Sequence, residues 1–464
     1  MNANFFKNKK VHLVAVGGVG MSGLAHVLLT MGAVVSGSDI QRNYQTHRLE
    51  EMGVKVYIGH HEGNVDPSLD LLVHSSAVNP NLNDEVKKAY QLGIKVLQRS
   101  FFIRDILSKK TSFAVAGVHG KTTTSGMLTN IFEASGSQPS FIIGGKLLNY
   151  NTNARWTDSE VLVVEADESD GNLPLFEADY GVITNIEWEH TDFFKSLSDI
   201  QNTFYEFSKK IKKAIIVPES EHSLLASSRS LDLYTYGISN QADFQVQYME
   251  RQTNYTRFTV TVCHSDRHVF ELHVPGEHNV MNACAAIGLA YLFGVPLSDI
   301  EVGLKTFIGM GRRLEKIYES KGVCIVDDYA HHPTEVKASI KALKEKEKGC
   351  KIIGIFQPHR YSRFHAFQNQ FVEAFQGLDE LIVTDIYASG ETSREQMSSK
   401  ILCNEIKKKQ ESMVVEYFSS LEAIKKHILD RLNNRTTILV MGAGDISVFA
   451  HALKEYLIHE GVPN

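Results

Sequence analysis

The chain of 464 residues is too long for one ordinary hydrophobic core, so about three domains are expected. With 43% hydrophobic residues, 22% charged residues and a formal net charge of −6, it has the composition of a globular protein without the basic surface typical of nucleic-acid binding. Five cysteines without a C-x-x-C pair argue against a disulfide framework or a structural zinc site, and because no apolar run resembles a membrane span or a signal peptide, we expect a cytoplasmic protein without membrane insertion.

The first region, from residue 11 to about 98, alternates between short apolar runs that favour β-strands and patterns that favour helices. Such alternation is typical of βαβ units around a parallel sheet. A helical stretch at 100–110 follows, and the first domain is predicted to cover residues 1–109. Its strands are predicted at 11–16, 34–39, 54–59, 70–76 and 94–98.

The second region begins with an apolar strand at 111–117 and then alternates in the same way. Between about 242 and 276, apolar and polar residues alternate with a period of two, which predicts an antiparallel meander added to an α/β domain. The basic, glycine-containing stretch 309–316 is predicted to be a linker, so the second domain covers residues 110–312. Further buried strands are predicted at 161–167, 180–186 and 213–219, and a helix at 279–294.

The last region, residues 313–464, restarts the alternation of strands and helices and predicts a third α/β domain. Its strands are predicted in the runs VCIVDDYAHHP, KIIGIFQPHR, DELIVTDIYASG, MVVEYF and TTILVMGAGDIS. The expected fold class is therefore α/β throughout.

A first glycine turn follows the strand at 11–16. Gly18, Gly20 and Gly23 fit the pattern G-x-G-x-x-G, and Asp39 ends the next strand. Glycines let a diphosphate approach the backbone at the positive N-terminus of a helix, and the acidic residue is suited to accept hydrogen bonds from a ribose or a base. The pattern leaves open whether the ligand is a dinucleotide cofactor or another diphosphate, and a purely structural tight turn is the alternative.

A second glycine turn, AVAGVHGKTTTSG at 114–126, has the features of a phosphate-binding loop, although only two residues separate its glycines. Backbone amides of such a loop cradle phosphates, Lys121 is suited to neutralise their charge, and the hydroxyl of Thr122 is suited to bind Mg2+. The strand before the loop and the helical pattern after it favour a nucleoside triphosphate site.

Two further segments place metal-binding side chains at the ends of apolar strands. The run VVEADESD carries Glu165, Asp167, Glu168 and Asp170, and carboxylates at this edge of an open α/β sheet are suited to complete a triphosphate–Mg2+ site. The run TNIEWEHTD brings His190 to the same edge, where it is either a metal ligand or a structural histidine.

In the last region, Arg360 and Arg363 lie three residues apart, so on a helical turn they share a face. Two guanidinium groups in this arrangement suit a carboxylate or a phosphate, and the alternative is a surface ion-pair face. The glycine turn with Gly442 and Gly444 lacks a lysine, so a packing role is favoured there.

Together these motifs resemble the Mur ligase family. The resemblance runs through GGVGMSGLA, AGVHGKTTT, EADESD, TNIEWEH, GEHNVMNA, GMGRRLE, DDYAHHPTEV and QPHRYSR, in order, and covers essentially the whole chain. It implies a Rossmann-like N-terminal domain for a UDP-sugar, a central P-loop ATPase domain with added antiparallel strands, and a C-terminal Rossmann-like α/β domain that contacts ATP and an incoming amino acid.

The resemblance also implies roles for individual residues. ATP phosphates are expected on Gly117, Val118, His119, Gly120, Lys121, Thr122 and Thr123, and other parts of the nucleotide on Asn279, Asn282, Arg313 and Asp328. Mg2+ is expected on Thr122, Glu165 and His190. The uridine diphosphate is expected on Gly18, Gly20, Ser22, Asp39, Ser75 and Ser76, and the carboxylate of the amino acid on Arg360 and Arg363.

Within the family, the motifs are most similar to the branch that joins L-alanine to the lactyl carboxylate of UDP-N-acetylmuramate through an acyl phosphate, in the biosynthesis of peptidoglycan precursors. The expected catalytic residues are Lys121, Glu165 and His190, with Glu168, His190 or His332 as the group that takes a proton from the attacking amine. A monomer or weak homodimer is expected.

Three other functions are alternatives to this one. The same family contains a recycling branch that joins a whole tripeptide to the same sugar nucleotide. The first glycine turn alone is typical of a nicotinamide-dependent oxidoreductase, which leaves the second turn unexplained. A binding protein that holds ATP without ligation is the third alternative.

Overall fold

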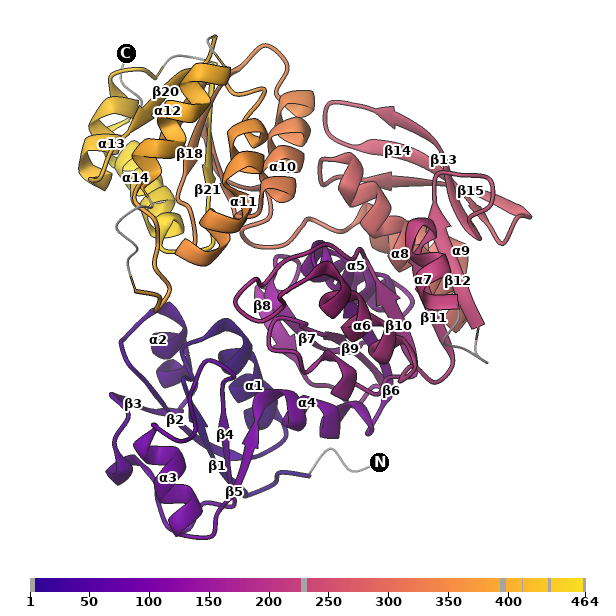
Figure 1. The fold of residues 1–464 in the computed structure, drawn as a ribbon. Helices are drawn as coiled ribbons and strands as arrows, with labels where there is room; N and C mark the ends of the chain where they lie inside the picture. The colour runs from indigo at the N-terminus through magenta and orange to yellow at the C-terminus, as the bar shows by residue number, and fades with distance from the viewer. Residues whose placement is uncertain (1–4, 227–231, 393–397, 411, 433–434, 462–464) are drawn as a thin grey trace.

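The computed structural model describes residues 5–226, 232–392, 398–410, 412–432 and 435–461. Consecutive parts of the chain form three separate sheets, and Figure 1 shows the corresponding α/β units, coloured indigo, magenta and yellow in chain order. Within these described ranges, no helix has both the length and the apolar character needed to cross a membrane.

The first sheet has five parallel strands in the order β3-β2-β1-β4-β5. Its strands are β1 (Lys10–Val14), β2 (Val34–Asp39), β3 (Lys55–Ile58), β4 (Leu71–His74) and β5 (Lys95–Gln98). The helices of this unit are α1 (Val19–Thr30), α2 (Tyr44–Glu51), α3 (Asp84–Gln91) and α4 (Arg99–Leu107), with a 3-10 helix at Glu62–Asn64. Because β2 and β4 flank β1, the first glycine turn lies where the strand order reverses, the usual ligand position of such sheets.

The second sheet has ten strands in the order β15-β14-β13-β12-β11-β10-β6-β9-β7-β8. Its strands are β6 (Thr111–Ala116), β7 (Ser140–Leu147), β8 (Thr152–Arg155), β9 (Val161–Glu165), β10 (Tyr180–Ile183), β11 (Ala214–Pro218), β12 (Asp232–Gly237), β13 (Phe244–Arg251), β14 (Thr256–Val262) and β15 (Asp266–Leu272). The helices are α5 (Lys121–Ala134), α6 (Leu197–Ser208), α7 (His222–Ala226), α8 (Glu277–Phe293) and α9 (Leu297–Lys305), with 3-10 helices at Leu173–Leu175 and Glu219–Glu221.

The antiparallel meander predicted between 242 and 276 is confirmed, because β13, β14 and β15 pair antiparallel in sequence order. Sequence reasoning missed the hairpin of β7 and β8, which pairs antiparallel at the other edge of this sheet. Gly144 and Gly145 interrupt the apolar pattern of β7, so the sequence there does not read as a strand.

The third sheet has six strands in the order β16-β17-β21-β18-β19-β20, and only β16 runs antiparallel to its neighbour in the described sheet. Its strands are β16 (Glu315–Ser320), β17 (Val323–Asp328), β18 (Lys351–Phe356), β19 (Glu380–Val383), β20 (Val414–Tyr417) and β21 (Thr436–Met441). The helices are α10 (Pro333–Lys346), α11 (Tyr361–Ala374), α12 (Ser399–Lys409), α13 (Leu421–Leu429) and α14 (Ile446–Glu460). The linker predicted at 309–316 overlaps β16, which begins at Glu315.

The helix that follows the second glycine turn is held deep in the second unit. In α5, every residue from Thr122 to Phe132 is buried, so the helix has no solvent-facing stripe in this stretch. Gly303 of α9 allows this packing, because a Cβ there would lie 2.5 Å from the Cα of Ile131. Since that neighbour is backbone, it has little freedom to move aside.

We expect Gly303→Ala to lower the apparent free energy of unfolding by about 1–3 kcal/mol, because the added methyl group overpacks the contact between α5 and α9. Urea denaturation measures the change. Val302→Ala on the same helix, where the side chain is half exposed, is the matched control and is expected to change stability by no more than about 0.5 kcal/mol. Equal stability of Gly303→Ala and the wild type would contradict the close approach.

Candidate active site

The second glycine turn connects β6 to α5 at the centre of the second sheet. Gly117 has φ +130°, and a side chain there would clash with the hydroxyl of Thr184 at the end of β10. Gly120 has φ +83° and begins α5 as its N-cap, where a Cβ would lie 2.5 Å from Oδ1 of Asn282. Both positions therefore require glycine, and the backbone N–H groups at the start of α5 make a site for an anion.

Lys121, the first residue of α5, lies among carboxylates. Its Nζ donates to Oε2 of Glu168 at 2.7 Å and to the carbonyl oxygen of Gly117 at 2.7 Å. Burial alone would lower the pKa of Lys121, but Glu168, Asp167 and Glu165 outweigh it and raise the pKa. The lysine is therefore positively charged at neutral pH and close to the loop.

Glu165 ends β9 beside this lysine and is held by two donors. The hydroxyl of Thr122 donates to Oε1 at 3.1 Å, and the N–H of Gly144 in the missed hairpin donates to Oε2 at 2.6 Å. Burial raises the pKa of Glu165. A hydroxyl and a carboxylate in contact are hard oxygen donors, so this pair fits the predicted Mg2+ site.

His190 does not contact Thr122 or Glu165. Its Nε2 lies 3.1 Å from Oε1 of Glu168, and one ligand atom each of Asp167, Glu168 and His190 lie within 4.8 Å of one another. Burial would raise the pKa of Asp167, but Lys121 and then His190 outweigh it and lower the pKa. The predicted ligands thus fall into two contacting groups, Thr122 with Glu165 and His190 with Glu168.

Residues predicted to hold other parts of the nucleotide come from two units. Asn279 and Asn282 lie on α8, and the amide of Asn282 donates to Oδ1 of Asn279 at 3.2 Å. Arg313 follows the second unit, and its Nη1 lies 3.3 Å from Oε1 of Glu335 on α10. Burial raises the pKa of Asp328, at the end of β17, to about 6.

The two predicted carboxylate-binding arginines lie at the start of α11 and face the loop after β10. Arg363 is buried, and its Nε donates to Oε1 of Glu189 at 2.8 Å. Arg360 has φ +67°, and its Nη1 donates to Oδ2 of Asp192 at 2.9 Å. In this structure both arginines are ion-paired to the second unit, Arg363 in a buried pair and Arg360 in a partly exposed one.

His119 lies where the second glycine turn meets the third unit. Its Nδ1 is 3.2 Å from Oε1 of Glu335, and its Nε2 is 3.5 Å from Oε2 of Glu187. Burial would lower the pKa of His119, but hydrogen bonding and charge from Glu187 and Glu335 outweigh it and raise the pKa to about 9. Sequence reasoning missed Glu335, which pairs with His119, and Glu189, which pairs with Arg363. In each pair the two residues lie on different units, and no local motif signals such a contact.

The first glycine turn has a different set of contacts. Asp39 is buried and its Oδ2 accepts from the N–H of Gly17 at 2.8 Å, so it fixes the turn. The Arg99 guanidinium, at the start of α4, lies against Gly20, where a Cβ would be 2.8 Å from Cζ. The Nε of Arg99 is buried and makes no hydrogen bond within the described part of the chain. Arg99 is therefore a phosphate-binding candidate that the motifs did not reveal.

The three serines predicted to hold the uridine diphosphate differ in their contacts. The hydroxyl of Ser22 in α1 donates to the carbonyl oxygen of Val19 at 3.0 Å. The hydroxyl of Ser75, just after β4, accepts from the N–H of Ala77 at 3.3 Å. Ser76 is exposed beside it.

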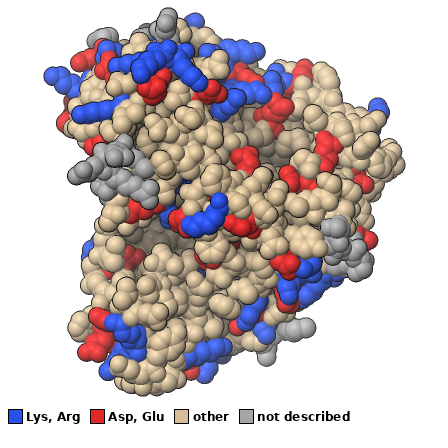
Figure 2. Space-filling view, in the orientation of Figure 1, with Lys and Arg blue, Asp and Glu red and all other residues tan. Residues whose placement is uncertain are grey.

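Figure 2 shows acidic and basic side chains interspersed on the face of the molecule that it draws, with a hollow in the left half of the view where the dark inner surface is visible.

These features define an enzyme of the P-loop class, built from three α/β units. Three family models match consecutive parts of the chain: "Mur ligase family, catalytic domain" at residues 10–111, "Mur ligase middle domain" at 115–290 and "Mur ligase, glutamate ligase domain" at 312–444. The chain belongs to the Mur ligase family, which confirms the resemblance and the fold class predicted from its motifs.

Individual relatives are similar over nearly their whole length. The UDP-N-acetylmuramate–L-alanine ligase of Desulforamulus reducens is 37% identical over 446 residues, which are 95% of this chain and 96% of the relative. The crystal structure of the UDP-N-acetylmuramate–alanine ligase of Thermotoga maritima matches with a TM-score of 0.84 and 27% identity, covering 97% of this chain and 99% of that one. The murein peptide ligase of Psychrobacter arcticus shares the fold, with a TM-score of 0.73, 23% identity and coverage of 98% and 100%.

The charge of His119 makes one contact between units depend on pH. Because its pKa is raised from 6.5 to about 9, the stabilisation from its charge is complete below pH 6.5 and is lost as pH rises through about 9. We expect an NMR titration of the His119 ring to show a midpoint near pH 9, with His119→Gln used to assign the signal. A midpoint at or below 6.5 for His119 would show that Glu187 and Glu335 do not hold it.

Proposed function

We propose that this chain is an ATP-dependent ligase that joins L-alanine to the lactyl carboxylate of UDP-N-acetylmuramate. The observation that carries the proposal is the path of the loop after β10. At its start Thr184 contacts the second glycine turn, and further along Glu189 contacts Arg363. One short segment therefore connects a phosphate-binding loop with a pair of arginines suited to a carboxylate, which is the pairing that an amino-acid ligase needs.

The similarity to L-alanine ligases supports the choice of substrates, because it extends over almost the full length of both chains. We assign the sugar nucleotide to residues 1–109, the triphosphate to residues 110–312 and the amino acid to residues 313–464. In this assignment the first glycine turn, Asp39 and Arg99 hold the uridine diphosphate end, and no nicotinamide cofactor is needed to explain the turn.

The chemistry follows from the charges of the substrates. A carboxylate resists attack by an amine because of its negative charge, so the γ-phosphoryl group of ATP is first transferred to it, giving an acyl phosphate and ADP. The amine of L-alanine then attacks the acyl carbon, a C–N bond forms, and inorganic phosphate leaves. Because both partners in the first step are anions, catalysis depends chiefly on positioning and on neutralisation of charge.

The residues of this chain supply those two effects. Lys121 is charged and placed at the glycine turn, and phosphate oxygens would take over its contact with Glu168. Thr122 and Glu165 would hold Mg2+, whose positive charge stabilises the phosphoryl group during transfer. The narrow fit at Gly117 and Gly120 brings backbone N–H groups close to the phosphates.

The attacking amine must lose a proton, and three residues are candidates to accept it. Glu168 keeps its ion pair with His190 after phosphate takes over the contact with Lys121, so its charge stays partly compensated. Burial is the largest effect on His332 and lowers its pKa, which keeps the ring neutral at neutral pH and able to accept a proton. Because Glu189 lies near both His332 and Arg363, we favour His332 as the base.

The assignment is tested by measuring phosphate release with ATP, Mg2+ and UDP-N-acetylmuramate while L-alanine, glycine, L-serine and the murein tripeptide are offered separately. Release is expected only when the sugar nucleotide and an amino acid are both present, with L-alanine the best acceptor. We expect Lys121→Ala to abolish release while binding of the sugar nucleotide, measured by calorimetry, is unchanged. Lys209→Ala, which removes an exposed lysine of the same unit, is the matched control. A preference for the tripeptide, or release without the sugar nucleotide, would overturn the proposal.

Arg360→Ala is expected to raise the KM for L-alanine by roughly 10-fold or more, because loss of a charge-assisted hydrogen bond costs about 1.5–3 kcal/mol. The KM for ATP is expected to change by no more than about twofold. Steady-state kinetics with each substrate varied in turn measures both constants. Asp192→Asn removes the carboxylate that occupies Arg360 and is expected to leave the KM for L-alanine unchanged or lower it. An unchanged KM for L-alanine in Arg360→Ala would remove this arginine from the pocket.

A further inference from the structure

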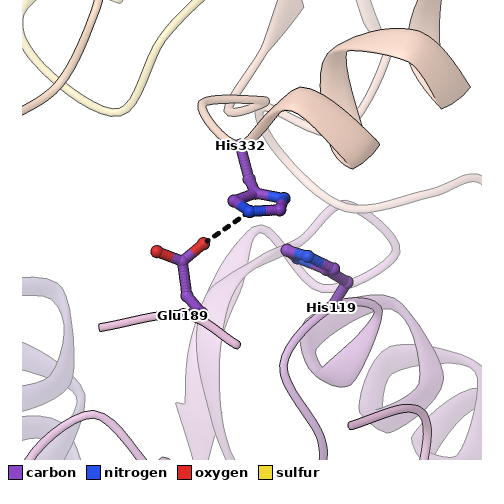
Figure 3. A group of neighbouring side chains, drawn as sticks. All are labelled: His119, Glu189 and His332. Carbon is purple, nitrogen blue, oxygen red and sulfur yellow. Dashed lines mark ion pairs between the residues drawn. The ribbon is translucent and has the colours of Figure 1, made fainter. Parts of the chain in front are cut away.

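Two buried side chains and one partly buried side chain converge at the contact between the second and third units, apart from Thr122 and Glu165. His119 comes from the second glycine turn, Glu189 from the loop after β10, and His332 from the N-cap of α10. One ligand atom from each of the three lies within 4.8 Å of the others. Figure 3 shows the two rings and the carboxylate side by side, with His332 directed at Glu189.

Each of these three residues has one side-chain atom without a hydrogen bond. Nε2 of His119, Oε2 of Glu189 and Nε2 of His332 are all buried and form no hydrogen bond with any described residue. Glu189 is 3% exposed and His332 is 4% exposed. A buried polar atom without a hydrogen bond costs about 1–3 kcal/mol. Here Nε2 of His119 and Nε2 of His332 have only long ion pairs, at 3.5 Å to Glu187 and at 3.8 Å to Glu189, so the cluster is incompletely satisfied.

The remaining atoms of the three residues do have partners, and these hold the side chains in place. Oε1 of Glu189 accepts from Arg363 at 2.8 Å, which leaves Oε2 with only the 3.8 Å ion pair to Nε2 of His332. Nδ1 of His119 lies 3.2 Å from Glu335, and a metal-bound histidine commonly donates its other ring N–H to a carboxylate in this way. These contacts hold the three side chains in place.

The charge of the surroundings favours a cation at that centre. Glu187 and Glu335 flank His119 at 3.5 Å and 3.2 Å, so two further carboxylates lie beside the cluster. Burial would raise the pKa of Glu189, but Arg363 and His332 outweigh it and lower the pKa, so this ligand is ionised. His332 stays neutral, as a metal ligand must be.

We propose that His119, Glu189 and His332 form a second divalent-cation site, which bridges the central and C-terminal units and takes a transition ion such as Zn2+ or Co2+ rather than Mg2+. Two imidazoles and one carboxylate are the ligand set of a zinc site with an open position. Mg2+ prefers oxygen ligands, so the ions divide between this cluster and the Thr122–Glu165 pair by the chemistry of the donors.

Binding requires a small contraction and two proton shifts. Nε2 of His332 and Oε2 of Glu189 are 3.8 Å apart, whereas two ligands about 2.0–2.1 Å from one tetrahedral ion are separated by ~3.3 Å. The cation replaces the extra proton of His119. In His332 the remaining proton moves to Nδ1, which ends the 3.4 Å bond from the N–H of Thr334. That bond is long, so its loss is a modest cost.

The consequence of such a site is a metal-dependent connection between two units. His119 and Glu189 belong to the segment 110–312 and His332 to the segment 313–464, so an ion bound to all three holds the units in the docked arrangement. The ion would also bind His332, the residue that we favour as the base, so Zn2+ is expected to inhibit ligation. The binding test below does not depend on the proposed ligase reaction.

The site is tested with Co2+, whose visible absorption reports nitrogen and oxygen ligands. The full-length protein is titrated without nucleotide in saturating Mg2+, and bound Co2+ is counted by equilibrium dialysis. Wild type is expected to bind one Co2+ that His332→Gln and His119→Gln each bind at least about 10-fold more weakly. Zn2+ should raise the Tm of the wild type and not of these two variants.

Two matched variants separate this site from others. His47→Gln removes an exposed histidine of the first unit and is expected to bind Co2+ as the wild type does. His190→Gln removes the other histidine-containing cluster, and it is expected to keep the Co2+ that His332→Gln loses. Circular dichroism checks that each variant is folded. Equal Co2+ affinity of wild type, His332→Gln and His119→Gln would overturn the proposal and leave the cluster as an ion-paired contact between units.

Discussion

The carboxyl ends of β9, β6 and β10 lie next to one another at one edge of the second sheet, and the contacts of the candidate active site depend on this arrangement. β9 ends with Glu165, β6 leads into the glycine turn, and β10 leads into the loop that carries Glu187, Glu189 and Asp192. Parallel pairing of the three strands therefore brings a metal ligand, a phosphate loop and an acidic loop together within the second unit. This arrangement needs no contribution from another unit.

Opposite charges then hold the third unit against that edge. Arg363 is buried against Glu189, and Arg360 pairs with Asp192 in a more exposed position. An exposed pair contributes about 0–1 kcal/mol, whereas removal of one partner of a buried pair costs about 3–5 kcal/mol because the other charge is left uncompensated. Of these two pairs, the buried one therefore contributes more to the docked arrangement, and the exposed one can exchange with another carboxylate at little cost.

Local patterns predicted much of the fold. The alternation of apolar runs and helices predicted the parallel sheets, and the period-two pattern predicted the meander of β13 to β15. The hairpin of β7 and β8 was missed because Gly144 breaks the apolar pattern, yet its N–H is one of the two donors to Glu165. A residue can thus be essential to a site through its backbone alone, without a side chain that a motif could reveal.

The site was predictable only as far as its local motifs reach. Gly117 to Thr122 could be identified because the loop contacts its ligand with consecutive residues. The partners of His119 could not, because Glu335 lies more than two hundred positions away and is brought near by docking between units. The resemblance to a family supplied residue roles, but it gave no sign that Glu189 and Asp192 occupy the arginines in this structure.

Arg99 affects the surroundings of both glycine turns. Its guanidinium lies against Gly20 in the first glycine turn, and its charge also contributes to the lowered pKa of Asp167 beside Lys121. An anion bound at the first turn would neutralise part of this charge and so weaken the positive potential at the second. An anion at one glycine turn would therefore change the affinity of the other turn for its own anion, because one guanidinium contributes to the electrostatics of both.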